Sequence, residues 1–504
     1  MDILEAKEGI KTTIKMYLKK DETGAYVIPV KRQRPVFLLG APGIGKTAIM
    51  EQIAQEMGIG LVSYAMTHHT RQSALGLPYI AQKKYGDEEY SISEYTMSEI
   101  ISSVYETMEM SGLKEGILFL DEINCVSETL APSMLQFLQY KTFGRHRVPD
   151  GWVIVTAGNP PEYNRMVREF DVVTMDRLKI VNVEPDLKAW KKYAAARQMH
   201  GAILAYLEIK PEDFYHMEMS AKGRSYVTAR GWEDLSDMLK MYEEEKCPAD
   251  ETLVGQYLAN ERVVKEFTAY YDLYNKYKRD YNISAILEGK APKETIERAK
   301  AARFDERISL LSMLTDNVEN SMLRAMNRTD ILKKLNPLLA AYKNKLQDMD
   351  ADEAEGFITS LKDNMEKQRK KLDAGGALSD AENRVYRGSI KLLEEAGLKM
   401  RHVSGSSEAL NIPIERYREL HKKLQEESGE TSAKLEALFA FAEEAFEEGN
   451  ELLTLLTRLT VSPVSSRYIA AFGSETYNRL SESMMVSRRH DRLKEEIESL
   501  EISL

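Results

Sequence analysis

The sequence predicts a parallel α/β domain followed by a long, mostly helical region. Eleven of the fifteen prolines and seventeen of the twenty-eight glycines fall within residues 1–250. In that half, short apolar runs alternate with helical patterns, as βαβ units require. From about Pro185 the strand patterns stop, and a helical periodicity rich in Ala, Leu, Glu and Lys continues almost to the last residue. We therefore expect the second half to be all helical.

Five short apolar runs, each followed by a polar or glycine-containing turn, are candidate buried strands. They are Val36 to Leu39, Gly60 to Tyr64, Ile117 to Leu120, Val153 to Ala157 and Ile180 to Val183. Five such strands fit a parallel sheet between helices. In the helical half, Ser379 to Glu382 fits a capping box, and Thr431 or Ser432 is a candidate start for a further helix after a break at Gly429.

Length and composition limit the classes of protein. A chain of 504 residues is expected to form about two or three domains, and we expect an α/β core over 1–185, a helical subdomain over 186–280 and a helical extension over 281–504. The net charge of −11 argues against a strongly cationic nucleic-acid binder. Two cysteines, Cys125 and Cys247, are too few for a disulfide framework.

No membrane or secretion signal is evident in the sequence. Residues 1–20 alternate apolar and charged residues and lack the continuous apolar stretch of a signal peptide. No segment approaches the length of a membrane span. We therefore expect a soluble, cytoplasmic protein.

A glycine-rich run after the first candidate strand has the pattern of a phosphate-binding loop, the Walker A motif. Glycines allow the backbone N–H groups to point at phosphates, and the following helix contributes its positive N-terminal end. Lys46 is predicted to contact the β and γ phosphates, and the Thr47 hydroxyl to bind Mg²⁺. The residues predicted to bind nucleotide are Gly40, Ala41, Pro42, Gly43, Ile44, Gly45, Lys46, Thr47 and Ala48.

Two carboxylates follow the strand that begins at Gly116, and they resemble a Walker B motif. They stand at the carboxyl end of the strand, where ligands bind in open α/β sheets. We predict that Asp121 holds Mg²⁺ and that Glu122 polarises the attacking water as the general base. A further strand ends at Gly158, so the Asn159 amide would lie beside Glu122 and orient the same water if the two strands are neighbours. A simple turn at Asn159 explains that residue equally well.

The order and spacing of these motifs resemble the AAA+ ATPases of the MoxR type, relatives of the midasin and dynein motor modules. The resemblance covers about residues 30–245. Its runs are Gly40 to Thr47, Leu118 to Asn124, Thr156 to Pro160, Met175 to Leu178 and Ala229-Arg230. It implies an AAA+ core with a helical lid, ATP and Mg²⁺ as ligands, and assembly into a homo-oligomeric ring, expected to be a hexamer. ATP is the family's nucleotide, although phosphate motifs alone do not distinguish it from GTP.

The resemblance also implies roles for three residues in hydrolysis. Asn159 would be sensor 1, and Arg230 would be sensor 2 on the lid. Arg177 would be the arginine finger that reaches the neighbouring subunit's site, where its charge stabilises the transferred phosphoryl group. Arg168 and Arg165 stand close by and are alternatives for that finger.

Two further segments resemble inserts of the same family. Within the long stretch from His68 to Gly112, the segment Ser73 to Pro78 resembles the family's insertion within helix 2, and such inserts line or approach the ring pore. A hairpin beginning near Phe143, with its tip at Asp150-Gly151, is expected before the sensor strand.

The leading functional hypothesis is a chaperone-like ring motor that remodels a protein partner. No Asp-x-Ser-x-Ser motif is present, and family members often act with a von Willebrand A domain on a separate protein, so such a protein is the implied partner. One alternative is a nucleic-acid-associated motor or defence factor, which the acidic composition disfavours. The other is a scaffold whose assembly is gated by nucleotide.

Overall fold

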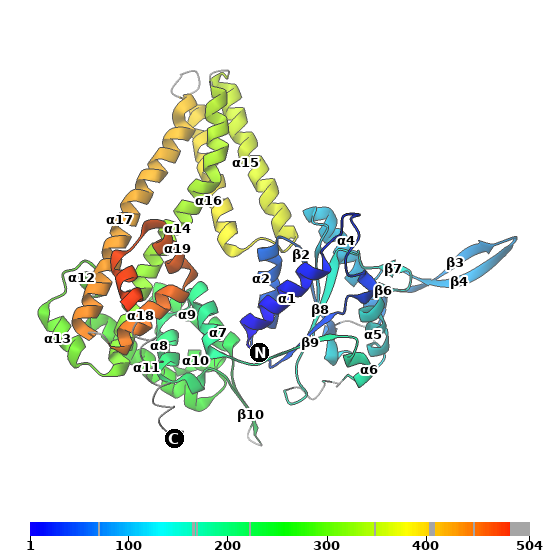
Figure 1. Ribbon diagram of the computed structural model, residues 1–504, viewed down its shortest axis with the longest axis horizontal. Coiled ribbons are helices and arrows are strands. Elements are labelled where there is room, and N and C mark those ends of the chain that lie inside the picture. Colours follow the sequence, from blue (N-terminus) through cyan, green and yellow to red (C-terminus); the bar gives the residue numbers. More distant parts are fainter. Residues whose placement is uncertain are drawn as a thin grey trace, which may run out of the picture. The chain divides into compact units, whose positions relative to one another are not determined.

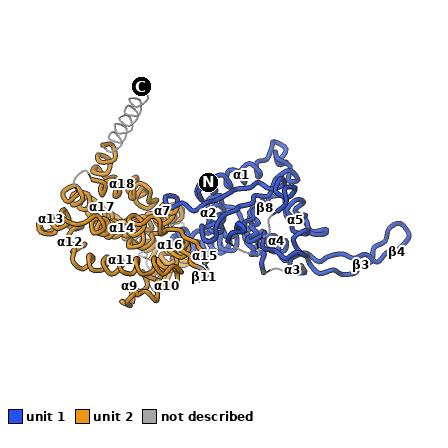
Figure 2. Tube along the Cα trace, turned by 90° about the horizontal axis from the view of Figure 1, so that it is seen from below, with its two compact units in different colours: residues 1–189, 360–386 blue, residues 190–359, 387–504 orange. Residues whose placement is uncertain are grey.

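The computed structural model describes residues 1–68, 71–163, 167, 170–220, 223–346, 349–402, 409–446 and 449–483. The chain forms two compact units (Figure 2). The first contains residues 1–189 and 360–386, and the second contains residues 190–359 and 387–504. The chain therefore passes between the units three times, after residues 189, 359 and 386.

A five-stranded parallel sheet forms the centre of the first unit (Figure 1). Its strand order is β2-β5-β8-β1-β9. The strands are β1 (Val36–Gly40), β2 (Gly60–Ala65), β5 (Gly116–Asp121), β8 (Trp152–Gly158) and β9 (Lys179–Val183). All five predicted strands are confirmed to within one or two residues. The inner strands β1, β5 and β8 are mostly apolar and buried, whereas the edge strands β2 and β9 include exposed polar residues such as Ser63 and Asn182.

Helices cover both faces of this sheet. Leu118, Leu120 and Ile154 belong to a core cluster with side chains of α4 (Glu99–Ser111) and α5 (Ala131–Tyr140). On the opposite face, α2 (Lys46–Met57) packs against β5 and β2, and α1 (Ile3–Tyr17) packs against α2 and β9. The unit also contains α3 (Arg71–Leu75), α6 (Val172–Met175) and the start of α7 (Leu187–Ala196). The fold is an α/β core of the predicted class.

The outer edge of β2 is covered by residues from much later in the sequence. Helices α15 (Ala351–Ala374) and α16 (Asp380–His402) form a hairpin whose connecting segment belongs to the first unit. The Leu61 N–H donates to the Gly375 carbonyl at 2.9 Å. Gly376 follows with φ +67° and lies against Leu61. Edge strands expose unpaired backbone groups, and this hairpin satisfies one of those groups on β2.

A second hairpin extends from the first unit within the stretch 68–112 (Figure 1). It pairs β3 (Pro78–Tyr85) with β4 (Glu88–Tyr95) in antiparallel register. Tyr79, Tyr85 and Tyr90 are exposed on it. A shorter pair, β6 (Thr142–Phe143) and β7 (His146–Arg147), turns at Gly144. The predicted tip at Asp150-Gly151 was therefore wrong, since those residues instead form the turn that leads into β8.

The second unit is built mainly of helices. Its helices after α7 are α8 (Gly201–Ile209), α9 (Ala229–Glu244), α10 (Glu251–Tyr257), α11 (Glu261–Asp280), α12 (Ile283–Leu287), α13 (Lys293–Ala301), α14 (Phe304–Lys345), parts of α15 and α16, α17 (Ile412–Phe446), α18 (Asn450–Val461) and α19 (Pro463–Phe472). A hairpin of β10 (His216–Ser220) and β11 (Gly223–Val227) interrupts them. This hairpin corrects the prediction that the second half is all helical.

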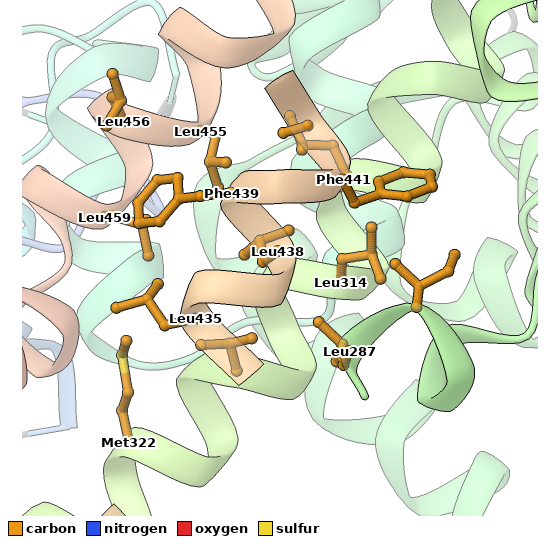
Figure 3. Close-up of a cluster of buried hydrophobic side chains, with 14 of the residues drawn as sticks. Leu287, Leu314, Met322, Leu435, Leu438, Phe439, Phe441, Leu455, Leu456 and Leu459 are labelled. Atoms are coloured by element: carbon orange, nitrogen blue, oxygen red, sulfur yellow. The ribbon is translucent and has the colours of Figure 1, made fainter. Parts of the chain in front are cut away.

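Leucine and phenylalanine side chains from α12, α14, α17 and α18 form the main core of the second unit (Figure 3). Leu314, Leu438 and Leu455 are fully buried there. The aromatic side chains of α11, including Phe267 and Tyr274, are also buried and serve as packing. Within the ranges that the structure describes, no helix is long and apolar enough to cross a membrane.

One predicted helix start is confirmed and another is wrong. Ser379 caps α16, since its hydroxyl accepts from the Glu382 N–H at 3.2 Å and its own N–H donates to the Glu382 carboxylate. Thr431 does not begin a helix, because α17 runs through it and through Gly429 without interruption. Its hydroxyl donates to the Glu427 carbonyl inside the helix at 2.7 Å. This local bond accommodates a residue type that elsewhere favours helix starts.

Candidate functional site

The glycine-rich loop joins β1 to α2 at the carboxyl edge of the sheet, as the Walker A pattern requires. Gly43 and Gly45 adopt positive φ angles of 72° and 96°, which glycine adopts without steric cost. Gly40 is required for a different reason, because a Cβ there would lie 2.6 Å from the Val183 carbonyl oxygen of β9. The loop therefore begins where β1 lies close against β9, and it leads directly into the N-terminus of α2.

Lys46 is the first residue of α2 and is buried. Its ammonium group donates to the carbonyl oxygens of Gly40 and Ala41 at 2.7 and 2.8 Å. It also donates to Oδ1 of Asn159 at 2.8 Å. The side chains predicted as phosphate contact and as sensor therefore meet at the ends of neighbouring strands β1 and β8.

The two predicted acidic residues lie at the end of β5 and adopt different conformations. The Thr47 hydroxyl donates to Oδ2 of Asp121 at 3.0 Å, and Oδ1 of Asp121 accepts the Glu122 N–H at 2.9 Å. Glu122 has φ 55°, in the left-handed region that non-glycine residues rarely adopt. Such strain is concentrated at functional sites.

A residue outside the recognised motifs contacts Glu122. The Thr67 hydroxyl, just beyond the end of β2, donates to Oε2 of Glu122 at 2.8 Å. The sequence offered no pattern for this contact. Only the pairing of β2 with β5, with Ala65 opposite Asp121, reveals it.

Asn124 ends the run Leu118 to Asn124 that contributes to the family resemblance, but the sequence assigns it no role. It lies in the short helix η3 (Ile123–Cys125), directly after Glu122, and is 4% exposed. Its Nδ2 donates to the backbone carbonyl of Asn159 at 2.8 Å. The acid segment and the sensor loop are therefore joined by a side-chain bond as well as by the sheet.

The Cys125 thiol lies close to the acid pair. Burial raises its pKa, and the nearby Glu122 and Asp121 carboxylates raise it further. The sulfur is thus held as a thiol, which is a poor nucleophile. Cys247 is exposed and belongs to the second unit.

Of the arginines predicted to act in hydrolysis, the structure describes two. Arg177 lies between α6 and β9, two residues before the strand begins. It is exposed and donates to Oε1 of Gln139 at 2.9 Å. The alternatives Arg165 and Arg168 lie outside the described residues. Arg230 is exposed in the first turn of α9, in the second unit.

The oxygen atoms of Thr47 and Asp121 suit a hard cation such as Mg²⁺. This ion takes one or two protein oxygens and completes its shell with water and phosphate. Among the residues described, no group of three or more His, Cys, Asp or Glu side chains could hold a metal. The donor set therefore fits a metal that is bound jointly with a nucleotide.

The parallel sheet, the glycine-rich loop and the acid pair define a P-loop nucleotide-binding domain. Residues 35–178 match the family model described as an AAA domain of the dynein-related subfamily. This match supports an AAA+ ATPase domain in this segment, and the family generally binds and hydrolyses ATP. AAA proteins are usually oligomeric. A search of curated proteins finds no match to the chain.

Proposed function

We propose that the protein is a ring-forming AAA+ ATPase of MoxR type that uses ATP hydrolysis to remodel or activate a protein partner. One observation carries the proposal. Lys46, Thr47, Asp121 and Asn159 meet at the carboxyl edge of one sheet, with Glu122 beside them. The AAA match over residues 35–178 supports the same class.

Within this proposal, the loop from Gly40 to Ala48 binds the ATP phosphates through its backbone N–H groups and through Lys46. Thr47 and Asp121 hold Mg²⁺, which neutralises charge on the phosphates when it is bound. Glu122 accepts a proton from the attacking water, and Asn159 orients that water. Glu122 suits this task because its backbone conformation and its bond to Thr67 fix the carboxylate.

The proposed ring follows from the role assigned to Arg177. An arginine supplied by a neighbouring subunit stabilises the transferred phosphoryl group and makes hydrolysis depend on assembly. Its exposure on the first unit is compatible with reaching another subunit. We propose a hexamer, in line with the resemblance.

Residues 186–280 are proposed as the lid, with Arg230 as sensor 2, and residues 281–504 as the region that binds the partner. Lid and extension residues fall in the same compact unit, except for 186–189 and 360–386. A lid movement would therefore carry most of the helical extension with it. The resemblance favours a partner with a von Willebrand A domain.

The test is ATP hydrolysis by size-separated assemblies of wild type, Glu122→Gln and Arg177→Ala, alone and mixed in equal amounts. Each variant alone should lose at least about 100-fold in kcat. The mixture should recover activity, because some junctions pair an intact Glu122 with an intact Arg177. The control is Arg279→Ala, which also removes an exposed arginine, but one that lies in the second unit and not in the first. This variant should retain wild-type activity.

Two results together would overturn the ring motor and favour the nucleotide-gated scaffold. A stable monomer would hydrolyse ATP at the wild-type rate, and Arg177→Ala would leave that rate unchanged. Recovery in the mixture would direct the next experiment to the partner. In that experiment, a von Willebrand A protein should bind the ATP-loaded Glu122→Gln assembly more tightly than the ADP-loaded assembly.

A further inference from the structure

We propose that Asn124 is a positioning residue of the ATP site, which acts by holding the backbone of Asn159. The inference rests on the proposed ATPase function and adds a residue to it. Asn124 lies two residues after Glu122, in η3, and its carboxamide is buried beneath the end of β8. Its Nδ2 donates to the Asn159 carbonyl at 2.8 Å.

Gly158 makes this approach possible. A Cβ at position 158 would lie 2.4 Å from Oδ1 of Asn124, far inside van der Waals contact. Only a glycine lets the carboxamide lie directly under the strand end. The close packing of Asn124 on Gly158 therefore belongs to the same arrangement as its bond to Asn159.

The orientation of the Asn124 carboxamide is fixed by chemistry. A carbonyl oxygen accepts and cannot donate, so the NH₂ end must face Asn159. The reversed amide would place two oxygens 2.8 Å apart and lose the bond. Because the group is 4% exposed, water cannot readily replace that bond.

The two ends of Asn159 have different partners. Its backbone carbonyl is held by Asn124, while its side-chain Oδ1 accepts from Lys46. The backbone anchor leaves the side chain able to rotate from Lys46 toward a water or a phosphate without moving the loop. Asn124 also links this loop to the turn that carries Glu122. The positions of the general base and the sensor relative to each other are therefore held by this side chain. Displacement of such a group by about 1 Å can cost on the order of 100-fold in rate.

The experiment compares steady-state ATP hydrolysis and ADP affinity in assembled wild type, Asn124→Ala and Asn124→Asp. Asn124→Asp keeps the side-chain volume and removes the Nδ2 donor. It therefore tests the lost hydrogen bond even if Asn124→Ala folds poorly. The matched control is Gln33→Ala, which also removes a buried carboxamide that donates to backbone carbonyls, at 2.9 and 3.1 Å. Gln33 stands before β1, at the amino end of the sheet, whereas the site lies at the carboxyl end.

Both Asn124 variants should lose about tenfold or more in kcat, with KM for ATP and Kd for ADP changed less than about threefold. A double-mutant cycle identifies the route of the effect. In an Asn159→Ala background, Asn124→Ala should cost less than about twofold, because the side chain that it positions is gone. Gln33→Ala should retain wild-type kcat.

Equal losses in the wild-type and Asn159→Ala backgrounds would overturn the inference, as would unchanged kcat in both Asn124 variants. Failure of the proposed function gives a different result, since wild type itself would then not hydrolyse ATP. In that case the inference fails together with the function. If wild type is active, the inference is decided by the Asn124 variants alone.

Discussion

The hydroxyl of Thr67 donates a hydrogen bond to Oε2 of Glu122 at 2.8 Å, across the gap between the ends of β2 and β5. The bond fixes one carboxylate oxygen and leaves the other to accept a proton. Thr67→Val keeps the shape of the side chain and removes the donor. We expect kcat for ATP hydrolysis to fall about three- to tenfold with KM unchanged, because the proposed base loses its orientation.

The control for Thr67 is Thr23→Val, which removes a comparable exposed bond between a threonine hydroxyl and a carboxylate, here Asp21, at 2.6 Å. It should leave hydrolysis unchanged. A Thr67→Val variant that is faster than wild type would show that the bond restrains Glu122 instead of preparing it.

Lys141 should make the first unit more stable as the pH rises above 8. Its ammonium group is buried, donates to Gln33 and to the Trp152 carbonyl, and has a pKa lowered by burial to about 8. The unfolded chain therefore binds more protons than the folded chain between pH 8 and about 10.5, and stability increases with pH across that window by up to about 3 kcal/mol.

Lys141→Met should flatten the dependence of the melting temperature on pH between 8 and 10. The exposed Lys114 provides the control, and Lys114→Met should keep the wild-type slope. An unchanged slope in Lys141→Met would show that the buried lysine does not titrate in this range.

Glu243 should stabilise the second unit down to low pH. Burial raises its pKa, but hydrogen bonds and charge from His200 and Lys278 outweigh burial and bring the pKa to about 2. The contribution is fully present above about pH 4.5 and is lost as the pH falls toward 2, with a size of about 2 kcal/mol. Glu243→Gln should lower the melting temperature at pH 6 and reduce the difference between pH 6 and pH 3. Equal differences in both proteins would contradict the assignment.

Two glycines of the α15–α16 hairpin should respond oppositely to alanine. Gly376 has φ +67°, and a Cβ there would lie 3.3 Å from the Leu61 Cβ. Gly376→Ala should therefore cost about 1–2 kcal/mol. Gly397 lies inside α16 with open space around it, so Gly397→Ala should stabilise by up to about 1 kcal/mol. Thermal melting of both variants measures these effects. Destabilisation of equal size in both would contradict a close packing of Gly376 against Leu61 of β2.

The sequence predicts the central sheet well because its inner strands β1, β5 and β8 are mostly apolar and buried. The hairpins β3–β4 and β10–β11 escaped prediction for the opposite reason. Strands β3 and β4 mix Tyr, Lys, Glu and Ser and expose most of these side chains, so no alternation marks them. Strands β10 and β11 are only five residues long and mix polar and apolar residues. The predicted helix break at Gly429 was wrong for another reason, because α17 continues through this residue. Flanking helix-forming residues and tertiary packing outweigh the low helix propensity of one glycine.

The motif residues of the site were predicted from local patterns, while their supporting contacts were not. Lys46, Thr47 and Asp121 carry a recognisable spacing, and the structure brings them together. Thr67 and Asn124 contact Glu122 and Asn159 only because β2, β5 and β8 are adjacent in the sheet. Strand order is a property of the folded chain that a linear pattern does not contain.

The segment that covers β2 also determines when the first unit can be completed during synthesis. Residues 360–386 belong to that unit, yet residues 190–359 must leave the ribosome before them. At about 5–20 residues per second, β2 waits on the order of ten seconds or more with its outer edge uncovered. During that interval it can pair with another nascent chain. A fragment that ends before residue 360 would keep this exposed edge permanently and should aggregate, even though it contains the whole AAA match.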